Sequence, residues 1–286
     1  MQDNTYLKGK IIYALGIFLY TINDALMKWL VPTYPVEKII FYRSLIGVVI
    51  VLAFQTMFGK TAILKINNSS VMLARCIFSF GALFFSLKSL TGLDLSSFNM
   101  YYHLSPIFIV LFSFLFLKEP LTKNLLIALC AGFVGVILTF HPGIGTLSIH
   151  KGYVLLATLS WSFSMIFLKL LSNKDSSKSI LFYNAVFNII ICALFVEEFT
   201  LAPSDLLAFS MLSAVHLLAF YIIIEGLKRA PLTQAAPLEY TGVIWALPIS
   251  YFFWNEIPDM WMLVGGSLII FASMYTLNVK NTPAKI

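Results

Sequence analysis

Charged residues are scarce in this sequence. Asp, Glu, Lys and Arg together make up 11% of the 286 residues, whereas about a quarter is typical of a soluble globular protein. Hydrophobic residues make up 59% of the chain, and 26 residues are Phe. So few charges cannot cover a surface that faces water, which excludes a soluble globular domain. The composition predicts a protein that crosses the lipid bilayer several times.

Cysteine is rare, and the sequence patterns of common enzymes are missing. Cys76, Cys130 and Cys192 stand singly in separate apolar segments, which excludes a disulfide framework and a cysteine-based metal site. The sequence contains no GxxxxGK(S/T) phosphate loop, no HExxH, no GxSxG and no paired-aspartate run for a magnesium-bound diphosphate. We therefore expect neither an enzyme nor a protein with a metal or other cofactor.

A basic patch is missing as well. The net charge is +6, but the 19 Lys and Arg residues are scattered over short segments between apolar runs, so binding to nucleic acid is not expected. Most of them, including Lys8, Lys60, Arg75 and Lys228, fall on the side of the bilayer that holds the N-terminus. By the positive-inside rule, both termini are predicted to be cytoplasmic.

Apolar runs of spanning length fill most of the chain. They lie at 11–30, 36–58, 71–90, 95–117, 121–140, 152–171, 178–199, 205–227, 232–254 and 260–279. The first run follows two lysines as a signal peptide would, but it carries Asn23, Asp24 and Lys28, so we expect a retained helix. The sequence thus predicts an all-α membrane protein with ten transmembrane helices.

The two halves of the chain resemble each other weakly. Ile39-Ile40-Phe41-Tyr42 is similar to Ile180-Leu181-Phe182-Tyr183, and Leu117-Lys118-Glu119-Pro120 is similar to the segment from Trp254 to Pro258, in both cases about 140 residues apart. A five-helix repeat at 1–142 and a second at 143–286 would each have an odd number of spans. They would therefore enter the membrane from opposite sides, as two inverted repeats, with a binding site between them near the midplane.

Glu239 is the most conspicuous candidate for a substrate-binding residue. It is the one ionisable carboxylate in the apolar run 232–254, and on a helix it shares a face with the small residues Ala235, Gly242 and Ala246. That face indicates either a close helix contact or the wall of a cavity. Trp245, further along the same run, is an expected aromatic surface of the cavity.

Charged and aromatic residues of the first two spans are further candidates. Tyr20 and Asp24 lie on one face of the first span, with Lys28 one turn beyond, and Arg43 lies about two turns into the second span. A guanidinium at that depth needs an acid or an anion, and Asp24, Glu239 or a substrate carboxylate can serve. A fixed structural salt bridge is the alternative for Arg43, and an ion pair with Lys28 is the alternative for Asp24.

Three central spans supply the remaining candidates. Asn99, Tyr102 and His103 lie on one side of the fourth span, Trp161 is in the middle of the sixth, and Asn184 is in the seventh, one turn before Asn188. The rings can stack on a planar ligand or simply pack against other helices. His103 is either a proton relay or a structural hydrogen-bonding group, and the asparagines bond either to a substrate or to neighbouring helices.

The chain resembles the EamA family of the drug/metabolite transporter superfamily. The resemblance is carried by ten spans in two repeats, by Phe41-Tyr42-Arg43, and by the Glu-Pro-like ends of the fourth and ninth spans. Asn23-Asp24, Ala236-Pro237 with Tyr240, and Asn255-Glu256 with Pro258 further resemble the S-adenosylmethionine uptake transporters within it. The resemblance implies a bacterial inner-membrane protein in which spans 1–4 and 6–9 surround a cavity, while spans 5 and 10 form a scaffold.

These observations predict a secondary transporter of a small organic metabolite that works by alternating access. Acids and aromatic rings suit a zwitterionic or cationic compound, with Glu239 facing its positive charge and Arg43 facing a carboxylate. S-adenosylmethionine uptake is the reading that the resemblance favours, and export of amino acids, other metabolites or drugs is the alternative. The sequence does not decide whether transport is coupled to a proton gradient or works by exchange, or whether the protein is a monomer or a homodimer.

Overall fold

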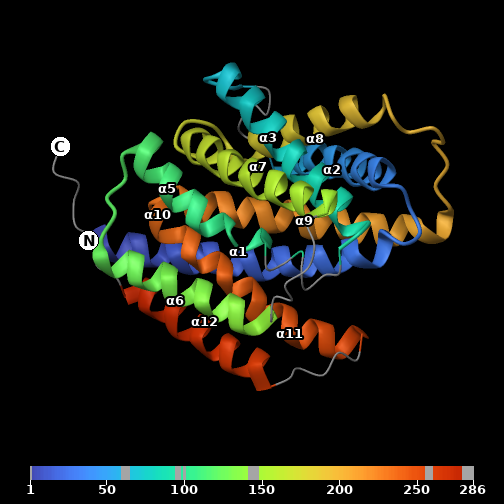
Figure 1. The fold of residues 1–286 in the computed structure, drawn as a ribbon. Coiled ribbons are helices and arrows are strands. Elements are labelled where there is room, and N and C mark those ends of the chain that lie inside the picture. Colours follow the sequence, from blue (N-terminus) through green and yellow to red (C-terminus); the bar gives the residue numbers. More distant parts are fainter. Residues whose placement is uncertain are drawn as a thin grey trace.

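The computed structural model describes residues 2–58, 65–93, 98, 101–140, 148–254 and 260–278. Throughout this part of the chain the regular structure is helical, without strands, which confirms the all-α prediction. Figure 1 shows the helices packed as one bundle. Their bounds are α1 Gln2–Leu30, α2 Val36–Phe58, α3 Ser69–Leu90, α5 Ser105–Leu117, α6 Lys123–Phe140, α7 Ile149–Ser172, α8 Ser177–Cys192, η1 Pro203–Asp205, α9 Leu206–Leu227, α10 Leu232–Ala235, η2 Ala236–Tyr240, α11 Thr241–Trp254 and α12 Met260–Asn278.

Each of the ten expected spans coincides with a helix or with successive helical segments. Five helices (α1, α2, α3, α7 and α9) are long and apolar enough to cross a membrane by themselves, and α5, α6, α8 and α12 contain shorter apolar stretches. The helix α1 begins at Gln2, well before the expected apolar run. Part of the fourth expected span, at 95–97 and 99–100, lies outside the described residues.

The seventh span ends earlier than the sequence predicts. We expected it to reach residue 199, but α8 ends at Cys192 and the chain has no further helix until η1 begins at Pro203. The expected last turn contains Glu197 and Glu198 side by side. Adjacent carboxylates at a helix C-terminus are repelled by the negative end of the helix dipole, which explains the early stop.

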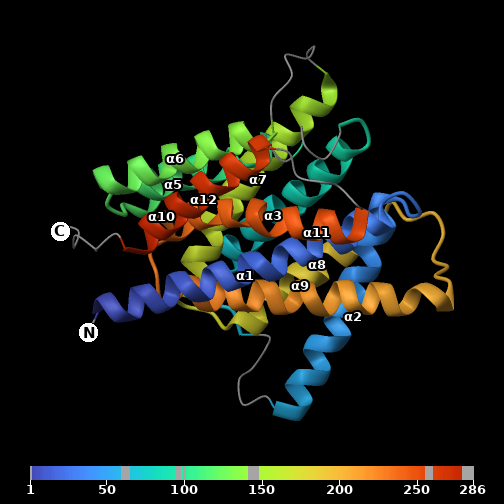
Figure 2. The ribbon, with the colours of Figure 1, turned by 90° about the horizontal axis from the view of Figure 1, so that it is seen from below.

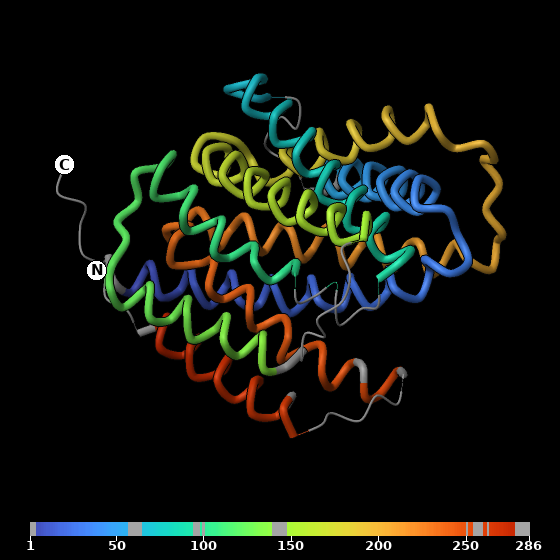
Figure 3. The backbone as a smooth tube through the Cα atoms, in the orientation of Figure 1, coloured from blue at the N-terminus to red at the C-terminus, as the bar shows by residue number. Residues whose placement is uncertain are grey.

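The ninth span is broken rather than continuous. The short helix α10 passes into the 3₁₀ segment η2, which carries Glu239, and only then does α11 begin. Figure 3 traces this path in orange. Pro237 lies at the start of η2, and because proline has no backbone N–H it cannot continue the hydrogen-bond ladder of α10. Pro248 lies inside α11 without ending it.

Helices far apart in the sequence form the main contacts of the bundle. The largest interfaces join α1 to α9, α3 to α7, α6 to α12 and α2 to α8. Figure 2 shows α1 and α9 lying side by side. Gly226 of α9 makes this approach close, since a Cβ atom added there would lie 2.8 Å from the backbone nitrogen of Tyr13. Two long helices, one from each half of the chain, therefore form one wall of the interior.

Charged side chains satisfy helix ends at one end of the bundle. The two carboxylate oxygens of Glu119 accept hydrogen bonds from the backbone nitrogens of Leu232 (2.9 Å) and Thr233 (2.7 Å), at the start of α10. Lys169 of α7 donates to the carbonyl oxygens of Leu227 and Ala230, at the end of α9. These contacts match charge to the helix dipole and fix the helix ends against one another.

Candidate functional site

A cavity of about 390 Å³ lies between α1, α2, α3, α7, α8, α9, η2 and α11. Its inner part is lined by Glu239, Trp161 and Ser105. From there it extends to the C-terminal ends of α1 and α3, where Lys28, Pro32, Leu90 and Leu93 line it. A volume of this order accommodates a small organic molecule.

Glu239 is held by three neutral donors at the inner part of this cavity. Its Oε1 atom accepts a hydrogen bond from the Tyr13 hydroxyl at 2.8 Å, and its Oε2 atom accepts one from the Ser105 hydroxyl at 3.2 Å. The indole nitrogen of Trp161 lies 3.3 Å from both oxygens. Glu239 is 9% exposed and, among the described residues, forms no ion pair. The carboxylate is therefore fixed in position, and no cation of the described chain neutralises it.

Aromatic rings surround the carboxylate. The ring of Tyr20 stacks on Trp161 with centroids 5.7 Å apart, and the ring of Tyr102 lies 6.4 Å from Trp161. Phe220 meets Trp161 edge to face at 5.9 Å. Tyr20, Tyr102, Trp161 and Phe220 all line the cavity, and we call them the aromatic cluster. A carboxylate flanked by the faces of several rings attracts an organic cation through both charge and cation–π contact.

Asp24 and Arg43 line the same cavity nearer its mouth, without pairing. Asp24 is open to the cavity and accepts a hydrogen bond from the Asn23 amide at 3.3 Å. Arg43 is 5% exposed, and its guanidinium donates to the Met27 sulfur at 3.8 Å, which is a weak acceptor. The salt bridge expected as the structural alternative for Arg43 is not found among the described residues. The expected pairing of Asp24 with Lys28 is not found either.

Two other predicted residues also line the cavity. His103 follows Tyr102 in the turn that leads into α5, and its ring stacks on Tyr240 at 6.3 Å. Asn184 of α8 faces the cavity from the side of Arg43. The structure thus brings together the predicted residues Tyr20, Asp24, Arg43, Tyr102, His103, Trp161, Asn184 and Glu239 around one cavity. Whether they bind a substrate stays a prediction.

One predicted residue is not at the cavity. Trp245 is 40% exposed and packs edge to face on Phe18 at 4.9 Å, and it is not among the cavity-lining residues. Its neighbour Ala246 lines the cavity, and one residue along a helix turns a side chain by about 100°. The prediction for Trp245 as a cavity surface is therefore wrong. Asn99 lies outside the described residues.

Sequence reasoning missed Arg75 and the donors Tyr13 and Ser105 as site residues. We assigned Arg75 to the cytoplasmic boundary, but it is 2% exposed and lies inside the bundle on α3. It is the seventh residue of α3, and Arg43 is the eighth residue of α2, so its similar depth is a signal that could have found it. The two donors carry no such signal, because a tyrosine and a serine are ordinary in apolar helices and only the packing of α1 and α5 aims them at Glu239.

Comparison with known proteins gives consistent matches over almost the whole chain. The EamA-like transporter family matches residues 7–141 and again 151–278. An S-adenosylmethionine uptake transporter of Rickettsia conorii is 26% identical, covering 96% of this chain and 93% of that protein. A pseudopaline exporter of Pseudomonas aeruginosa is 25% identical, covering 95% and 96%. One solved crystal structure shares the fold with a TM-score of 0.78 at 17% identity, covering 95% of this chain and 96% of the other.

Proposed function

Because this chain belongs to the EamA-like transporter family, we propose that it carries a small organic metabolite across the bacterial inner membrane by alternating access. Its five long apolar helices and its shorter ones make it a multi-pass membrane protein. The observation that carries the proposal is the cavity, in which a fixed carboxylate, an aromatic cluster and a buried guanidinium face one another across empty space.

Two inverted five-helix repeats, at 1–142 and 143–286, are part of the proposal. The family matches the chain twice, once in each half. The helix contacts support the same arrangement. The first helix of each half packs on the third helix of the other half, as α1 does on α9 and α7 does on α3. The second helices, α2 and α8, pack on each other, and so do the fifth helices, α6 and α12. A two-fold axis that relates the halves produces this pattern, and the cavity then lies at their interface.

We assign the present conformation to the outward-facing state. With cytoplasmic termini, the C-terminal ends of α1 and α3, where Lys28 and Leu93 line the cavity, face the outside. The other end is closed by packed side chains and by the contacts that Glu119 and Lys169 make with the ends of α10 and α9. Opening toward the cytoplasm requires these contacts to break as the two halves rock.

S-adenosylmethionine is the substrate we propose. Its sulfonium suits Glu239 and the aromatic cluster, its carboxylate suits Arg43, and its adenine offers a planar face to rings such as Tyr102. The similarity to transporters named for S-adenosylmethionine uptake in Rickettsia supports this choice. The bipolar lining of the cavity is what any zwitterion with a separate cationic centre would need.

Export of another metabolite is the second candidate. The similarity to an exporter in Pseudomonas is as extensive as that to the uptake transporters. The specific feature that favours an acidic cargo is that Arg43, 5% exposed, has no carboxylate partner within the described chain. The two candidates predict opposite directions of net movement under the same conditions.

Uptake into cells that express the chain tests the proposal. We expect labelled S-adenosylmethionine to accumulate above the level of cells with an empty vector, and excess unlabelled compound to suppress the signal. Accumulation below that of the vector control would indicate export. A thermal-shift screen of metabolites on the purified protein then identifies a different cargo, since a ligand of the folded state stabilises it in proportion to ln(1 + [L]/Kd). No accumulation and no stabilisation by S-adenosylmethionine would refute it as the substrate.

A further inference from the structure

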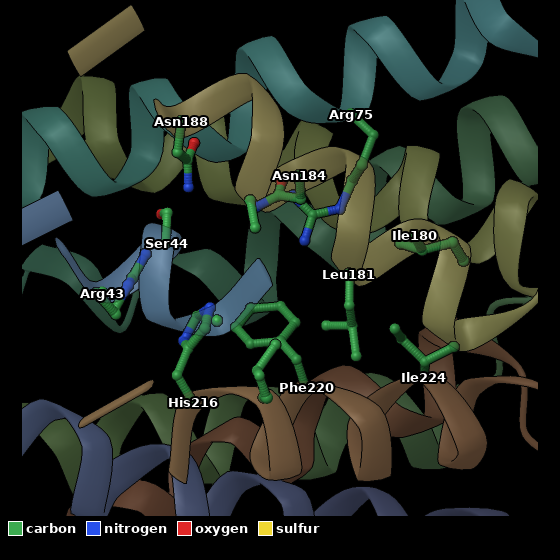
Figure 4. Close-up of a pocket in the computed structure, with 13 residues that line it drawn as sticks. Arg43, Ser44, Arg75, Ile180, Leu181, Asn184, Asn188, His216, Phe220 and Ile224 are labelled. Carbon is green, nitrogen blue, oxygen red and sulfur yellow. The ribbon is translucent and has the colours of Figure 1, made fainter. Parts of the chain in front are cut away.

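A second, smaller pocket lies beside the main cavity, between α2, α3, α8 and α9. It is lined by Arg43 and Ser44 of α2, Arg75 of α3, Asn184 and Asn188 of α8, and His216 and Phe220 of α9, together with apolar residues. Figure 4 shows Arg75 reaching from α3 toward Asn184, with His216 and Phe220 on the opposite side. Arg43, Asn184, His216 and Phe220 also line the main cavity. The pocket is therefore a polar side chamber of the proposed transport site.

Arg75 is a buried cation without a carboxylate. It is 2% exposed, its Nη1 atom donates to the Ser164 hydroxyl, and its Nε atom has no hydrogen-bond partner. Its guanidinium carbon lies 5.7 Å from the centre of the Phe220 ring. No carboxylate in the described part of the chain lies within ion-pair distance of it. A guanidinium buried this deeply in a membrane-spanning chain needs an anion.

Unsatisfied acceptors lie in the same pocket. The carboxamide oxygens of Asn184 and Asn188 and the Nδ1 atom of His216 are buried without a hydrogen-bond partner. Buried polar atoms of native proteins are nearly always paired, so these four atoms in one pocket, including the Nε atom of Arg75, form a site that can bind a polar ligand. A ligand that pairs them all must both accept hydrogen bonds from guanidinium groups and donate hydrogen bonds to carboxamides.

An α-amino-acid head group meets both requirements. Its carboxylate accepts from Arg75 and Arg43, and its ammonium donates to the oxygens of Asn184 and Asn188. The pocket has a volume of about 20 Å³, against about 390 Å³ for the main cavity, so it suits only a compact group of the ligand. The rest of such a ligand would extend past Phe220 into the main cavity, toward the aromatic cluster and Glu239.

We propose that this pocket is the subsite for the α-amino-acid head of the transported molecule, with Arg75 and Arg43 binding its carboxylate. The proposal rests on the proposed transport function and narrows it, because it restricts the cargo to compounds with a free amino-acid end. It also gives Arg75, Asn184 and Asn188 a role in selecting the cargo. A molecule with the same cationic centre but no carboxylate would leave both guanidiniums unpaired.

Binding of S-adenosylmethionine and of decarboxylated S-adenosylmethionine to the full-length protein in nanodiscs tests this subsite. We expect the intact compound to bind about 10- to 100-fold more tightly, the range for hydrogen bonds to a charged group. Arg75→Gln should remove most of that preference while leaving the affinity for the decarboxylated compound unchanged. Arg229→Gln removes the same charge at the end of α9, where Arg229 pairs with Glu225, and should keep the full preference.

A second variant guards against a folding defect in Arg75→Gln. Asn184→Asp is nearly isosteric and places beside Arg75 a carboxylate that still accepts from the ammonium of either compound, so it should reduce the preference for S-adenosylmethionine over the decarboxylated compound. If both variants keep the preference of the wild-type protein, the head group binds elsewhere and the proposal is refuted. Equal weakening of both compounds in both variants would also refute it, because that result indicates a general structural role.

A further measurement separates this proposal from the choice of S-adenosylmethionine as the cargo. L-methionine carries the head group alone, and 3-(methylthio)propylamine is its decarboxylated counterpart. In one outcome, S-adenosylmethionine fails to bind the wild-type protein while L-methionine stabilises it against heat. The subsite is then still supported if 3-(methylthio)propylamine does not stabilise the wild-type protein and L-methionine does not stabilise Arg75→Gln. If neither S-adenosylmethionine nor L-methionine stabilises the wild-type protein, the subsite proposal is overturned.

Discussion

Replacing Glu239 by glutamine separates its charge from its packing. The amide has nearly the same shape as the carboxylate, and its oxygen can keep the hydrogen bonds from Tyr13 and Trp161. Its NH₂ group can donate to the Ser105 hydroxyl, which now donates to Oε2 at 3.2 Å. All three neighbours remain satisfied, so Glu239→Gln should preserve the folded structure while removing the negative charge at the inner part of the cavity.

The expected effects on stability and on transport differ in size. Charge-assisted hydrogen bonds are about twice as strong as neutral ones, which would cost about 1 kcal/mol for each of three bonds, but removing a buried charge returns its desolvation penalty of several kcal/mol. The free energy of unfolding should therefore change little or rise. A cation in the aromatic cluster would lose its charge partner at a cost of about 2 kcal/mol or more, which lowers affinity about 30-fold.

The assay is uptake of labelled substrate into proteoliposomes, with thermal unfolding of the same purified preparation. Glu239→Gln should abolish measurable uptake at micromolar substrate and leave the melting temperature within a few degrees of the wild type. Glu225→Gln is the matched control, since Glu225 pairs with Lys228 and Arg229 at the end of α9. A Glu239→Gln protein that transports at the normal rate would show that the carboxylate is structural and refute the reasoning.

Two further predictions follow from the packing. Trp161→Ala should reduce uptake at least 10-fold by removing a ring beside the carboxylate, whereas Trp245→Ala, on the outer surface, should leave uptake unchanged. Gly226→Ala should destabilise the protein by about 1–3 kcal/mol, because the added Cβ would lie 2.8 Å from the backbone of Tyr13. Gly152→Ala, with no atom within 4 Å of its Cβ position, should be neutral in the same thermal-unfolding experiment. Equal effects within either pair would contradict the packing described above.

The number and order of helices could be predicted from the sequence because bilayer thickness imposes a length on every apolar run. The departures occur where local chemistry outweighs hydropathy. Pro237 breaks the ninth span inside an apolar run, and Glu197 with Glu198 ends the seventh early. Pro237 changes the average hydropathy of its run little, so only the loss of a backbone hydrogen-bond donor accounts for the break there. The two adjacent glutamates are a signal that the sequence does carry, and the helix dipole adds to their effect.

In the candidate site, the sequence predicts mainly those residues whose charge makes burial in an apolar run energetically costly. Glu239, Arg43 and Asp24 are conspicuous in apolar runs, and all three line the cavity. Trp245 was misplaced although helical spacing argues against it, since six residues along a helix turn a side chain about 120° away from Glu239. Ala246, seven residues on, lines the cavity instead. Arg75 was assigned to a helix end because it follows the start of its run closely, although the helix begins earlier, at Ser69, and carries it into the bundle.

The separation of charges in the cavity bears on how the proposed carrier would couple its movement to its cargo. Glu239 accepts hydrogen bonds from neutral donors, while Arg43 donates to a thioether and Arg75 to a hydroxyl. The opposite charges of the site therefore do not form a salt bridge with each other. Closing the cavity around unpaired charges would carry the full cost of desolvating them. A zwitterionic cargo supplies the missing partner at both ends, so we infer that its binding removes most of that cost and allows the outer end to close. Fusing the charges into an internal salt bridge would stabilise the empty closed state and uncouple movement from cargo.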